Sequence, residues 1–395
     1  MKYLCIIPDG LADEPLEELN GRTPMEAANT PHIDDWAARA QIGLARNVPD
    51  GLKPGSDVAI MSIVGLDPRK HYSGRAPIEA AAMGVPLGEG EVAYRCNFVT
   101  VENGVMKDFS AGHISSNEAA ALIEDLNRYF DGEARFYAGV SYRNICVLDD
   151  SYSEAECTPP HDLTDKEVLL PVGPAASKLI EIMDRSRQIL AEHPINEARR
   201  AKGQLPATQI WLWGQGKIPS VEPFVNRYGM SGALITAVDL VRGLGVLTGL
   251  EVVEVPGATG YYDTNYRGKA EYALESLERH PFCLVHIEAT DEAGHEGSYA
   301  RKIEVYEAID EQIVATLQSG LEGEEYRVLV VPDHPTPVKA KTHTSSPVPF
   351  LIFDTRRANQ GGAAFATLTF SERGAAQDGR SPIEGHELLG RLFDR

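Results

Sequence analysis

The sequence predicts an α/β protein, in which a mainly parallel sheet is flanked by helices and interrupted by a smaller inserted α+β domain. Toward both ends of the 395-residue chain, short apolar runs alternate with helical segments, a pattern typical of parallel strands joined by right-handed crossovers. From about residue 88 the runs instead alternate polar and apolar residues, as antiparallel strands do. We therefore expect one α/β domain built from residues 1–87 and 208–395, with residues 88–207 inserted as a second domain.

The composition is that of a soluble globular protein, with 43% hydrophobic and 24% charged residues. The chain has no run of about 18 apolar residues, so we expect no membrane-spanning helix. A formal charge of −21, without a block rich in Lys and Arg, argues against binding to nucleic acid or to an anionic membrane surface. A small anionic substrate would need a local basic pocket within this negative field.

The cysteines and the start of the chain indicate a cytoplasmic protein. The five cysteines are scattered and show no C-x-x-C spacing, which argues against a disulfide framework and for a reducing compartment. We interpret Cys5 and Cys283 as core residues of strands rather than as nucleophiles. The first apolar run is only about five residues long and ends in Pro-Asp-Gly, which favours a first strand over a signal peptide.

In the α/β domain, each buried strand is predicted from a short, continuous apolar run. Thr23 and Thr30 each precede a proline, which predicts two helices with threonine as N-cap. A glycine-rich loop then leads into an apolar helix, with Ser56 at or beside its N-terminus. The strands are expected at residues 2–8, 42–46, 209–214, 250–255, 282–288 and 328–332, and further helices at 233–247, 268–280 and 301–320.

In the inserted domain, Glu102-Asn-Gly marks a hairpin within the alternating stretch from residue 92 to 108. A helix is expected at about 115–130, a strand pair at 134–149, and a long amphipathic helix at about 174–193. These elements form an α+β unit.

Polar residues recur where the strands of the α/β domain end. Open α/β sheets place their ligands at the carboxyl ends of the strands, so we expect these side chains to converge with the hydroxyl of Ser56. Alone, each residue also has a structural interpretation as a turn residue, a helix cap or an exposed histidine. The residues that follow the strands are Asp9, Asp291, His295, Asp333, His334 and, nine positions further, His343.

A mixed set of oxygen and nitrogen donors suits two divalent ions such as Mn²⁺ or Zn²⁺ better than Ca²⁺. Asp291 and His295 are four residues apart, a spacing that lets both side chains share one ion. Two ions about 4 Å apart form a clamp for in-line phosphoryl transfer. Ser56, bound to a metal at the positive end of a helix, is the expected nucleophile.

Five motifs carry a resemblance that extends nearly from end to end of the chain. They are Pro-Asp9-Gly, Pro-Gly-Ser56-Asp-Val-Ala, Ser-Gly-Arg75-Ala-Pro-Ile-Glu-Ala, Asp291-x-x-x-His295, and Pro-Asp333-His334 followed by His343. They resemble the archaeal-type, cofactor-independent phosphoglycerate mutases of the alkaline phosphatase superfamily. The resemblance implies an alkaline-phosphatase-like α/β fold with an inserted cap that grips the substrate.

The resemblance also implies the roles of the site residues. In the family, the serine takes the phosphate from the substrate, the glycerate reorients, and the serine returns the phosphate to the other hydroxyl, so that no 2,3-bisphosphoglycerate is needed. Mn²⁺ is the expected ion, with Zn²⁺, Mg²⁺ and Co²⁺ as alternatives. One ion is expected on Asp291, His295 and His343, and the other on Asp9, Ser56, Asp333 and His334.

The cap is expected to supply the cations and hydrogen-bond donors that an anionic glycerate requires. A surface role is an equal alternative for each arginine. In the α/β domain, His286 lies in the middle of a strand and is interpreted as a packed core histidine, whereas the remaining histidines, at positions 32, 71, 193, 280 and 386, are interpreted as surface or capping residues. The candidate substrate-binding residues are His113, Arg143, His161, Asp162, Asn196, Arg199, Arg200 and Lys217.

Two other activities remain open. Bacterial members of the same family resemble sequences proposed as homoserine kinases, and a metal-activated serine could pass phosphate to homoserine. Against this, the segment before Lys217 lacks the upstream glycine, and the segment after it lacks the Ser/Thr, of a phosphate-binding loop. A metal-dependent phosphatase would use the same groups if water reached the phosphoserine. The sequence predicts a small phosphorylated substrate and does not predict an oligomeric state.

Overall fold

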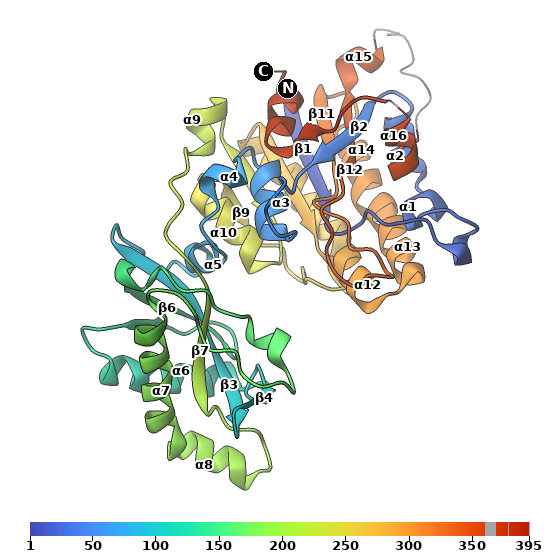
Figure 1. Ribbon diagram of the computed structural model, residues 1–395. Coiled ribbons are helices and arrows are strands. Elements are labelled where there is room, and N and C mark those ends of the chain that lie inside the picture. The colour runs from blue at the N-terminus through green and yellow to red at the C-terminus, as the bar shows by residue number, and fades with distance from the viewer. Residues whose placement is uncertain (360–368, 378, 395) are drawn as a thin grey trace. The chain divides into compact units, whose positions relative to one another are not determined.

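The computed structural model describes residues 1–359, 369–377 and 379–394 and divides the chain into two compact units (Figure 1). Unit 1 consists of residues 1–72 and 221–395, and unit 2 consists of residues 73–220. The predicted insertion at 88–207 lies within unit 2. That the inserted domain begins and ends at these two residues stays a prediction. Within the described residues, no helix is both long and apolar enough to cross a membrane.

Unit 1 is built on an eight-stranded mixed sheet, which confirms the predicted α/β class. Its centre is parallel: β1 pairs with β10 on one side and with β11 on the other, and β10 continues to β8 and β9. In sheet order the strands are β13 (Ile383–Glu384), β2 (Gln41–Arg46), β12 (Val348–Asp354), β11 (Tyr326–Val330), β1 (Lys2–Pro8), β10 (Phe282–Ile287), β8 (Gly232–Ile235) and β9 (Glu251–Val253).

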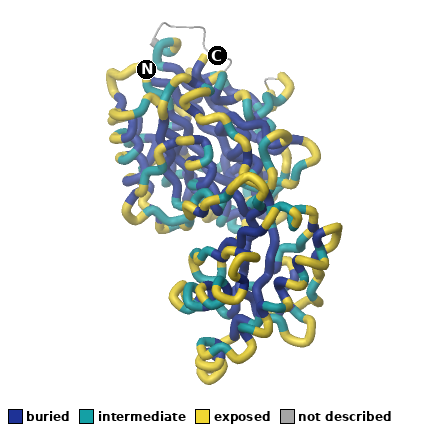
Figure 2. The backbone as a smooth tube through the Cα atoms, turned by 90° about the vertical axis from the view of Figure 1, so that its left-hand side faces the viewer, coloured by how far each residue is buried: buried dark blue, intermediate teal, exposed yellow. Residues whose placement is uncertain are grey.

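Helices cover both faces of this sheet, so β8, β10 and β11 are buried along their whole length and β1 is buried from Leu4 onward (Figure 2). On one face, Ile6 and Val285 of the sheet pack in one core with Trp36, Tyr306 and Leu277. The helices of unit 1 are α1 (Pro24–Ala27), α2 (Pro31–Ala37), α3 (Ser56–Ile63), α4 (Pro68–His71), α9 (Phe224–Tyr228), α10 (Asp239–Thr248), α11 (Tyr266–Arg279), α12 (Ala289–Glu296), α13 (Tyr299–Ala308), α14 (Ala315–Gly320), α15 (Thr355–Asn359), α16 (Glu372–Ala376) and α17 (Leu388–Leu392).

The predicted N-caps divide into one that is confirmed and one that is replaced. Thr23 accepts a hydrogen bond from the Glu26 amide and forms a capping box with that residue at the start of α1. Thr30 precedes α2 but makes no capping hydrogen bond with its side chain. The carboxylate of Asp310 accepts the first free amides of α2 instead, with Ile33 N at 2.7 Å. Asp310 lies in a π-helical turn, residues 309–314, which joins α13 to α14.

The predicted helix at 233–247 is wrong in its first part. Gly232–Ile235 forms the buried strand β8, and the helix α10 begins only at Asp239. A short apolar run fits a buried strand as well as a helix, and here the packing decides. A side-chain carbon at Gly232 would come within 2.8 Å of Leu250, so the backbone lies tight against its neighbours. The predictions also omitted β12, which pairs antiparallel with both β11 and β2.

Unit 2 is an α+β unit, as predicted, and its sheet has five antiparallel strands. The strand predicted at 209–214 for the α/β domain is wrongly placed, because it pairs antiparallel with β3 in this unit. The long strand β3 lies at its centre and pairs with β4, β6 and β7. The amphipathic helix α7 buries Leu179, Ile182 and Leu190 in the core of this unit. The strands are β3 (Glu91–Glu102), β4 (Val105–Asp108), β5 (Arg135–Tyr137), β6 (Arg143–Asp149) and β7 (Gln209–Gly216), and the helices are α5 (Ala76–Ala82), α6 (Ser116–Tyr129), α7 (Ala176–Ala191) and α8 (Pro194–Ala201).

Candidate active site

Four side chains meet beside the N-terminus of α3 in what we call the serine pocket: Ser56, Asp9, Asp333 and His334. Ser56 is the first residue of α3, and its Oγ lies 3.3 Å from His334 Nε2. The same nitrogen lies 3.2 Å from Asp333 Oδ2 and 3.8 Å from Asp9 Oδ1. The prediction that these groups converge at the carboxyl ends of β1 and β11 is therefore matched by the geometry.

Each carboxylate of the serine pocket has one oxygen held by the protein and one open. Asp333 Oδ1 accepts the Gly10 amide at 2.9 Å and the His334 amide at 2.7 Å, and Asp9 Oδ2 lies 2.8 Å from His286 Nε2. The other oxygens, Asp9 Oδ1 and Asp333 Oδ2, are buried without a hydrogen-bond partner among the described residues. Buried carboxylate oxygens are costly to leave unpaired. The donor set therefore fits a divalent cation.

The orientation of His334 also fits this interpretation. Thr336 Oγ1 donates to Asp291 Oδ1, so it can only accept from His334 Nδ1, which lies 3.3 Å away. The imidazole then carries its proton on Nδ1, and Nε2 presents a lone pair to the serine pocket. An outer hydrogen bond that fixes the tautomer in this way is typical of a metal-binding histidine.

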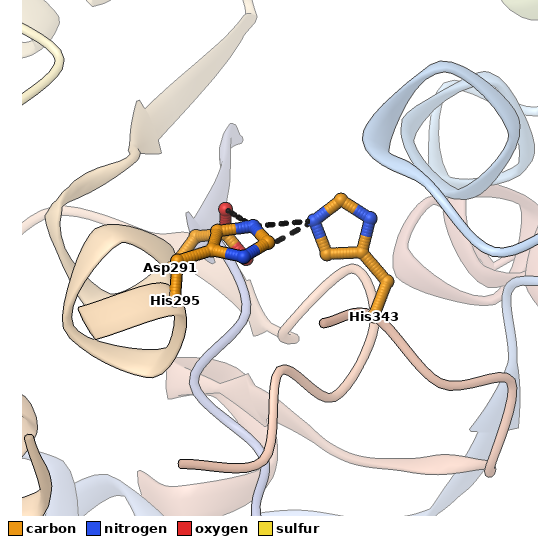
Figure 3. A group of neighbouring side chains, drawn as sticks. All are labelled: Asp291, His295 and His343. Atoms are coloured by element: carbon orange, nitrogen blue, oxygen red, sulfur yellow. Dashed lines mark hydrogen bonds and ion pairs between the residues drawn. The ribbon is translucent and has the colours of Figure 1, made fainter. Parts of the chain in front are cut away.

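A second group, which we call the histidine pocket, consists of Asp291, His295 and His343 (Figure 3). The two Nε2 atoms lie only 2.9 Å apart, and His295 Nε2 lies 3.1 Å from Asp291 Oδ2. His295 Nδ1 faces the carbonyl oxygen of Lys341 at 3.1 Å, so Nδ1 carries a proton and Nε2 is turned toward Asp291 and His343. The rings of His334 and His343 are 4.1 Å apart, which places the two pockets side by side.

The carboxylates at this edge of the sheet create an excess of negative charge. Burial raises the pKa of Asp9 well above its usual range, and the charges of Asp333, Glu288 and Asp291 raise it further. Burial acts in the same direction on Asp291, but hydrogen bonds from the histidine pocket outweigh it and lower the pKa of this group well below its usual range. The hydrogen bond with Asp291 raises the pKa of His295 to about 9. A bound cation would relieve the repulsion.

The loops that carry the ligands are packed closely together. Gly10 has φ +62°, and a side chain there would meet the Asp291 carboxylate and come within 2.6 Å of Thr336 Oγ1. The fully buried Lys302 donates to Gly10 O at 2.9 Å and to Thr336 O at 2.8 Å, and pairs with buried Asp13 at 2.9 Å. One ammonium group thus joins the loop after β1 to the loop after β11.

The residues predicted as substrate-binding lie in unit 2 in several different settings. Asn196 and Arg199 are buried: Asn196 bonds to Leu190 O and Ala207 O, and Arg199 bonds to Glu118 and to backbone carbonyls. These contacts stabilise the fold, and a role in substrate binding stays untested. Arg200, His113, Asp162 and Lys217 are exposed or half-buried, and Lys217 pairs with Asp150 at 3.0 Å.

Arg143 and His161 belong to what we call the cationic cluster, together with Arg75, Arg95 and Trp213. Arg95 is buried over the Trp213 ring at 4.1 Å, and the His161 ring is 5.3 Å from that of Trp213. Glu79 bridges Arg95 and Arg75, with 2.8 Å to each. Burial lowers the pKa of Arg95 to about 10, against the pull of Glu79, and the charges of Arg75 and Arg143 lower it further. The cluster is a local positive site in an acidic chain.

Sequence reasoning missed several residues around the site. Thr336, Lys302 and Glu288 were not singled out, although Glu288 is the last residue of the strand predicted at 282–288, at the same edge of the sheet as Asp9 and Asp333. His286 is buried as predicted, but it hydrogen-bonds Asp9 rather than packing only against apolar groups. In the cationic cluster, Arg95 gave no signal because it lies in the interior of an alternating strand.

Comparison with known proteins identifies the family of the chain. The family model described as 2,3-bisphosphoglycerate-independent phosphoglycerate mutase matches residues 37–196. A protein of that name from Methanothrix thermoacetophila is 51% identical over 397 residues, with all of both chains covered. A solved structure from Pyrococcus horikoshii shares 30% identity and a TM-score of 0.83, covering 100% of this chain and 96% of that one. A cofactor-independent phosphoglycerate mutase of Thermoplasma acidophilum shares 27% identity and a TM-score of 0.68, covering 100% and 99%. The chain therefore belongs to the 2,3-bisphosphoglycerate-independent phosphoglycerate mutases.

Proposed function

We propose that the chain interconverts 3-phosphoglycerate and 2-phosphoglycerate, with Ser56 carrying the phosphoryl group between the two hydroxyls. The observation that carries this proposal is the serine pocket. There the Ser56 hydroxyl lies 3.3 Å from the imidazole nitrogen of His334, beside two buried carboxylate oxygens that have no hydrogen-bond partner among the described residues. A hydroxyl at the first residue of a helix is also well placed to tolerate the growing negative charge of a nucleophile.

Two divalent ions, with Mn²⁺ as the first choice, would be held by residues of the two pockets. Asp9, Ser56, Asp333 and His334 would hold one ion, and the histidine pocket would hold the other. When bound, these ions would supply Lewis-acid stabilisation of the negative charge on the phosphoryl oxygens and on the serine oxygen. The pair of open carboxylate oxygens and the facing imidazole nitrogens support this assignment.

In the first half of the reaction, Ser56 Oγ forms a bond to the phosphorus, the bond between phosphorus and the glycerate oxygen breaks, and the serine proton ends on the freed hydroxyl. In the second half, the other glycerate hydroxyl attacks the phosphoserine and Ser56 regains its proton. Atoms and charge balance over the cycle, so no second phosphate donor is required. Holding the glycerate between the two halves requires groups that bind its carboxylate.

The cationic cluster of unit 2 is the best candidate for that role. Arg143 is exposed at the start of β6, and Arg75 is half-buried. Guanidinium groups recognise carboxylates and phosphates through paired hydrogen bonds. Trp213 and Glu79 hold the Arg95 side chain in place. Because this side chain is already ordered by the fold, substrate binding loses less free energy in ordering it.

Replacing Ser56 with alanine tests the central step. The Ser56→Ala variant should lose mutase turnover by at least about 10³-fold, since the covalent carrier is absent, while the histidine pocket still binds an ion. Wild-type enzyme treated with EDTA should also be inactive and should recover with Mn²⁺, whereas Ser56→Ala should not. As a matched control, Ser62→Ala in the same helix removes a hydroxyl that donates to the backbone oxygen of Asn47, and it should keep turnover. Substantial turnover by Ser56→Ala would refute the phosphoserine route.

A further inference from the structure

The histidine of β10 has a defined hydrogen-bonding environment on both ring nitrogens. His286 is fully buried, with Nδ1 3.1 Å from Thr236 Oγ1 and Nε2 2.8 Å from Asp9 Oδ2. Thr236 Oγ1 also accepts the amide of Val238 at 3.1 Å. Among the described residues, His286 Nδ1 is the one hydrogen-bond acceptor for the Thr236 hydroxyl proton, so Thr236 donates to it.

This arrangement decides the tautomer of His286. With Nδ1 accepting, the ring proton lies on Nε2. That N–H points at Asp9 Oδ2, and Glu288 Oε2 at 3.6 Å is a second carboxylate oxygen on the same side. Two carboxylate oxygens that face Nε2 can accept a hydrogen bond from a protonated Nε2, whereas they would repel a lone pair on this nitrogen.

His286 and His334 thus take opposite tautomers, each set by a threonine. Thr236 donates to His286 and turns its Nε2 into a donor, whereas Thr336 donates to Asp291 and leaves His334 Nε2 with a lone pair. His334 is suited to bind an ion, and His286 is suited to hold a ligand of that ion. The threonine partner of each buried histidine therefore decides which of these two roles the histidine can take.

We infer that the Thr236–His286 pair is a positioning device that holds Asp9 Oδ2, so that Asp9 offers only Oδ1 to the ion of the serine pocket. The inference rests on the proposed metal binding by Asp9. Asp9 Oδ2 is occupied by His286, whereas Oδ1 is buried and has no hydrogen-bond partner in the part of the chain that the structure describes. A carboxylate held at one oxygen binds an ion through the other, and loses less freedom when it does so.

An alternative use of the same atoms is a further metal site. Asp9, His286 and Glu288 each offer a ligand atom, and these atoms lie within 4.8 Å of one another. This use would require the proton of His286 to move to Nδ1, where it would displace the donated bond from Thr236. The two interpretations give opposite results for a substitution that keeps an N–H donor at position 286 but removes the imidazole.

The test is titration of Mn²⁺ into the metal-free full chain by calorimetry, in a His295→Ala background that removes a ligand of the histidine pocket. His286→Leu should weaken Mn²⁺ binding by about 10- to 100-fold, the usual effect of losing an outer hydrogen bond to a metal ligand. His286→Gln, whose amide N–H can still reach Asp9, should restore most of the affinity. Thr236→Val should weaken binding in the same direction, and Thr236→Ser should bind like the parent.

Two controls separate this inference from a general loss of folding and from the proposed function. Val285→Ala leaves a cavity in the same strand, and should lower stability without changing Mn²⁺ affinity. In the otherwise wild-type chain, excess Mn²⁺ should restore the turnover of His286→Leu. Equal Mn²⁺ affinity of His286→Leu and its parent would overturn the positioning role. So would a His286→Gln variant that binds Mn²⁺ as weakly as His286→Leu. The same holds if the parent binds one more ion per chain than both His286 variants do. Absence of Mn²⁺ binding by the wild-type chain would instead overturn the proposed metal site itself.

Discussion

Replacing Lys302 with methionine is expected to destabilise unit 1 strongly. The Lys302 ammonium is fully buried, pairs with buried Asp13 at 2.9 Å and donates to two backbone carbonyls. Methionine fills similar space but leaves the Asp13 carboxylate buried without its cation. Removing one partner of a buried ion pair costs about 3–5 kcal/mol. The neighbouring pair of Arg301 and Glu304, at 2.7 Å, is exposed, so Arg301→Met should cost at most about 1 kcal/mol.

Guanidinium unfolding followed by tryptophan fluorescence can measure this difference. Trp36 is the one tryptophan of the chain that belongs to unit 1, since Trp211 and Trp213 lie in unit 2. Phenylalanine at both positions of unit 2 therefore leaves a reporter for unit 1, which avoids treating two units as a single transition. The measurement is made in EDTA so that bound metal does not add to the stability.

A double variant sharpens the result. Asp13 also accepts the amides of Glu14 and Val338, so asparagine at position 13 removes the charge but keeps an acceptor for one of them. Lys302→Met combined with Asp13→Asn should be more stable than Lys302→Met alone. A loss below about 1 kcal/mol for Lys302→Met, the size expected of an exposed pair, would refute the reasoning, and so would a double variant less stable than the single one.

Two further predictions concern the site. Gly10→Ala should abolish Mn²⁺ binding at the histidine pocket, measured by calorimetry, because the backbone there is left-handed at φ +62° and the new methyl group would meet the Asp291 carboxylate. The control is Gly21→Ala, at a position that is also left-handed but has open space around it. Unchanged Mn²⁺ binding by Gly10→Ala would contradict the geometry. Arg143→Ala should raise KM for 3-phosphoglycerate by about tenfold or more, the effect of losing one charge-assisted hydrogen bond, with kcat little changed. The control is Arg187→Ala, which replaces an exposed arginine on α7. An unaltered KM for Arg143→Ala would exclude that residue from substrate binding.

The parts of the site that sequence could predict are those that follow a strand directly. Asp9, Asp333 and His334 come at the ends of apolar runs, and the spacing of Asp291 and His295 fits one helical turn. Parallel strands bring such positions to a common edge whatever the details of packing. The eight-stranded sheet was predicted as mainly parallel for the same reason, and its centre is parallel.

The supporting residues could not be predicted because their roles depend on contacts between distant segments. His286 looks like a core histidine in sequence, and only the register that sets Ile7 opposite His286 brings it to Asp9. Lys302 lies in a helix whose sequence pattern does not distinguish this lysine from an exposed one. The helix at 233–247 was placed too early because an apolar tetrapeptide carries no information on whether it lies beside a strand.

The central position of β1 has a consequence for how the protein is made. This strand is synthesised before its partners β10 and β11, which begin only at Phe282 and Tyr326, so a long stretch of chain must leave the ribosome before β1 can pair. The hydrogen bonds around Asp9 and Gly10 span 277 and 323 residues. Unit 2, by contrast, is one continuous segment whose contacts become available earlier. Contacts so distant in sequence form slowly and late. The edge of the sheet that carries the serine pocket and the histidine pocket is therefore among the last features to be completed during synthesis, and a chain that stops short of β11 cannot form it.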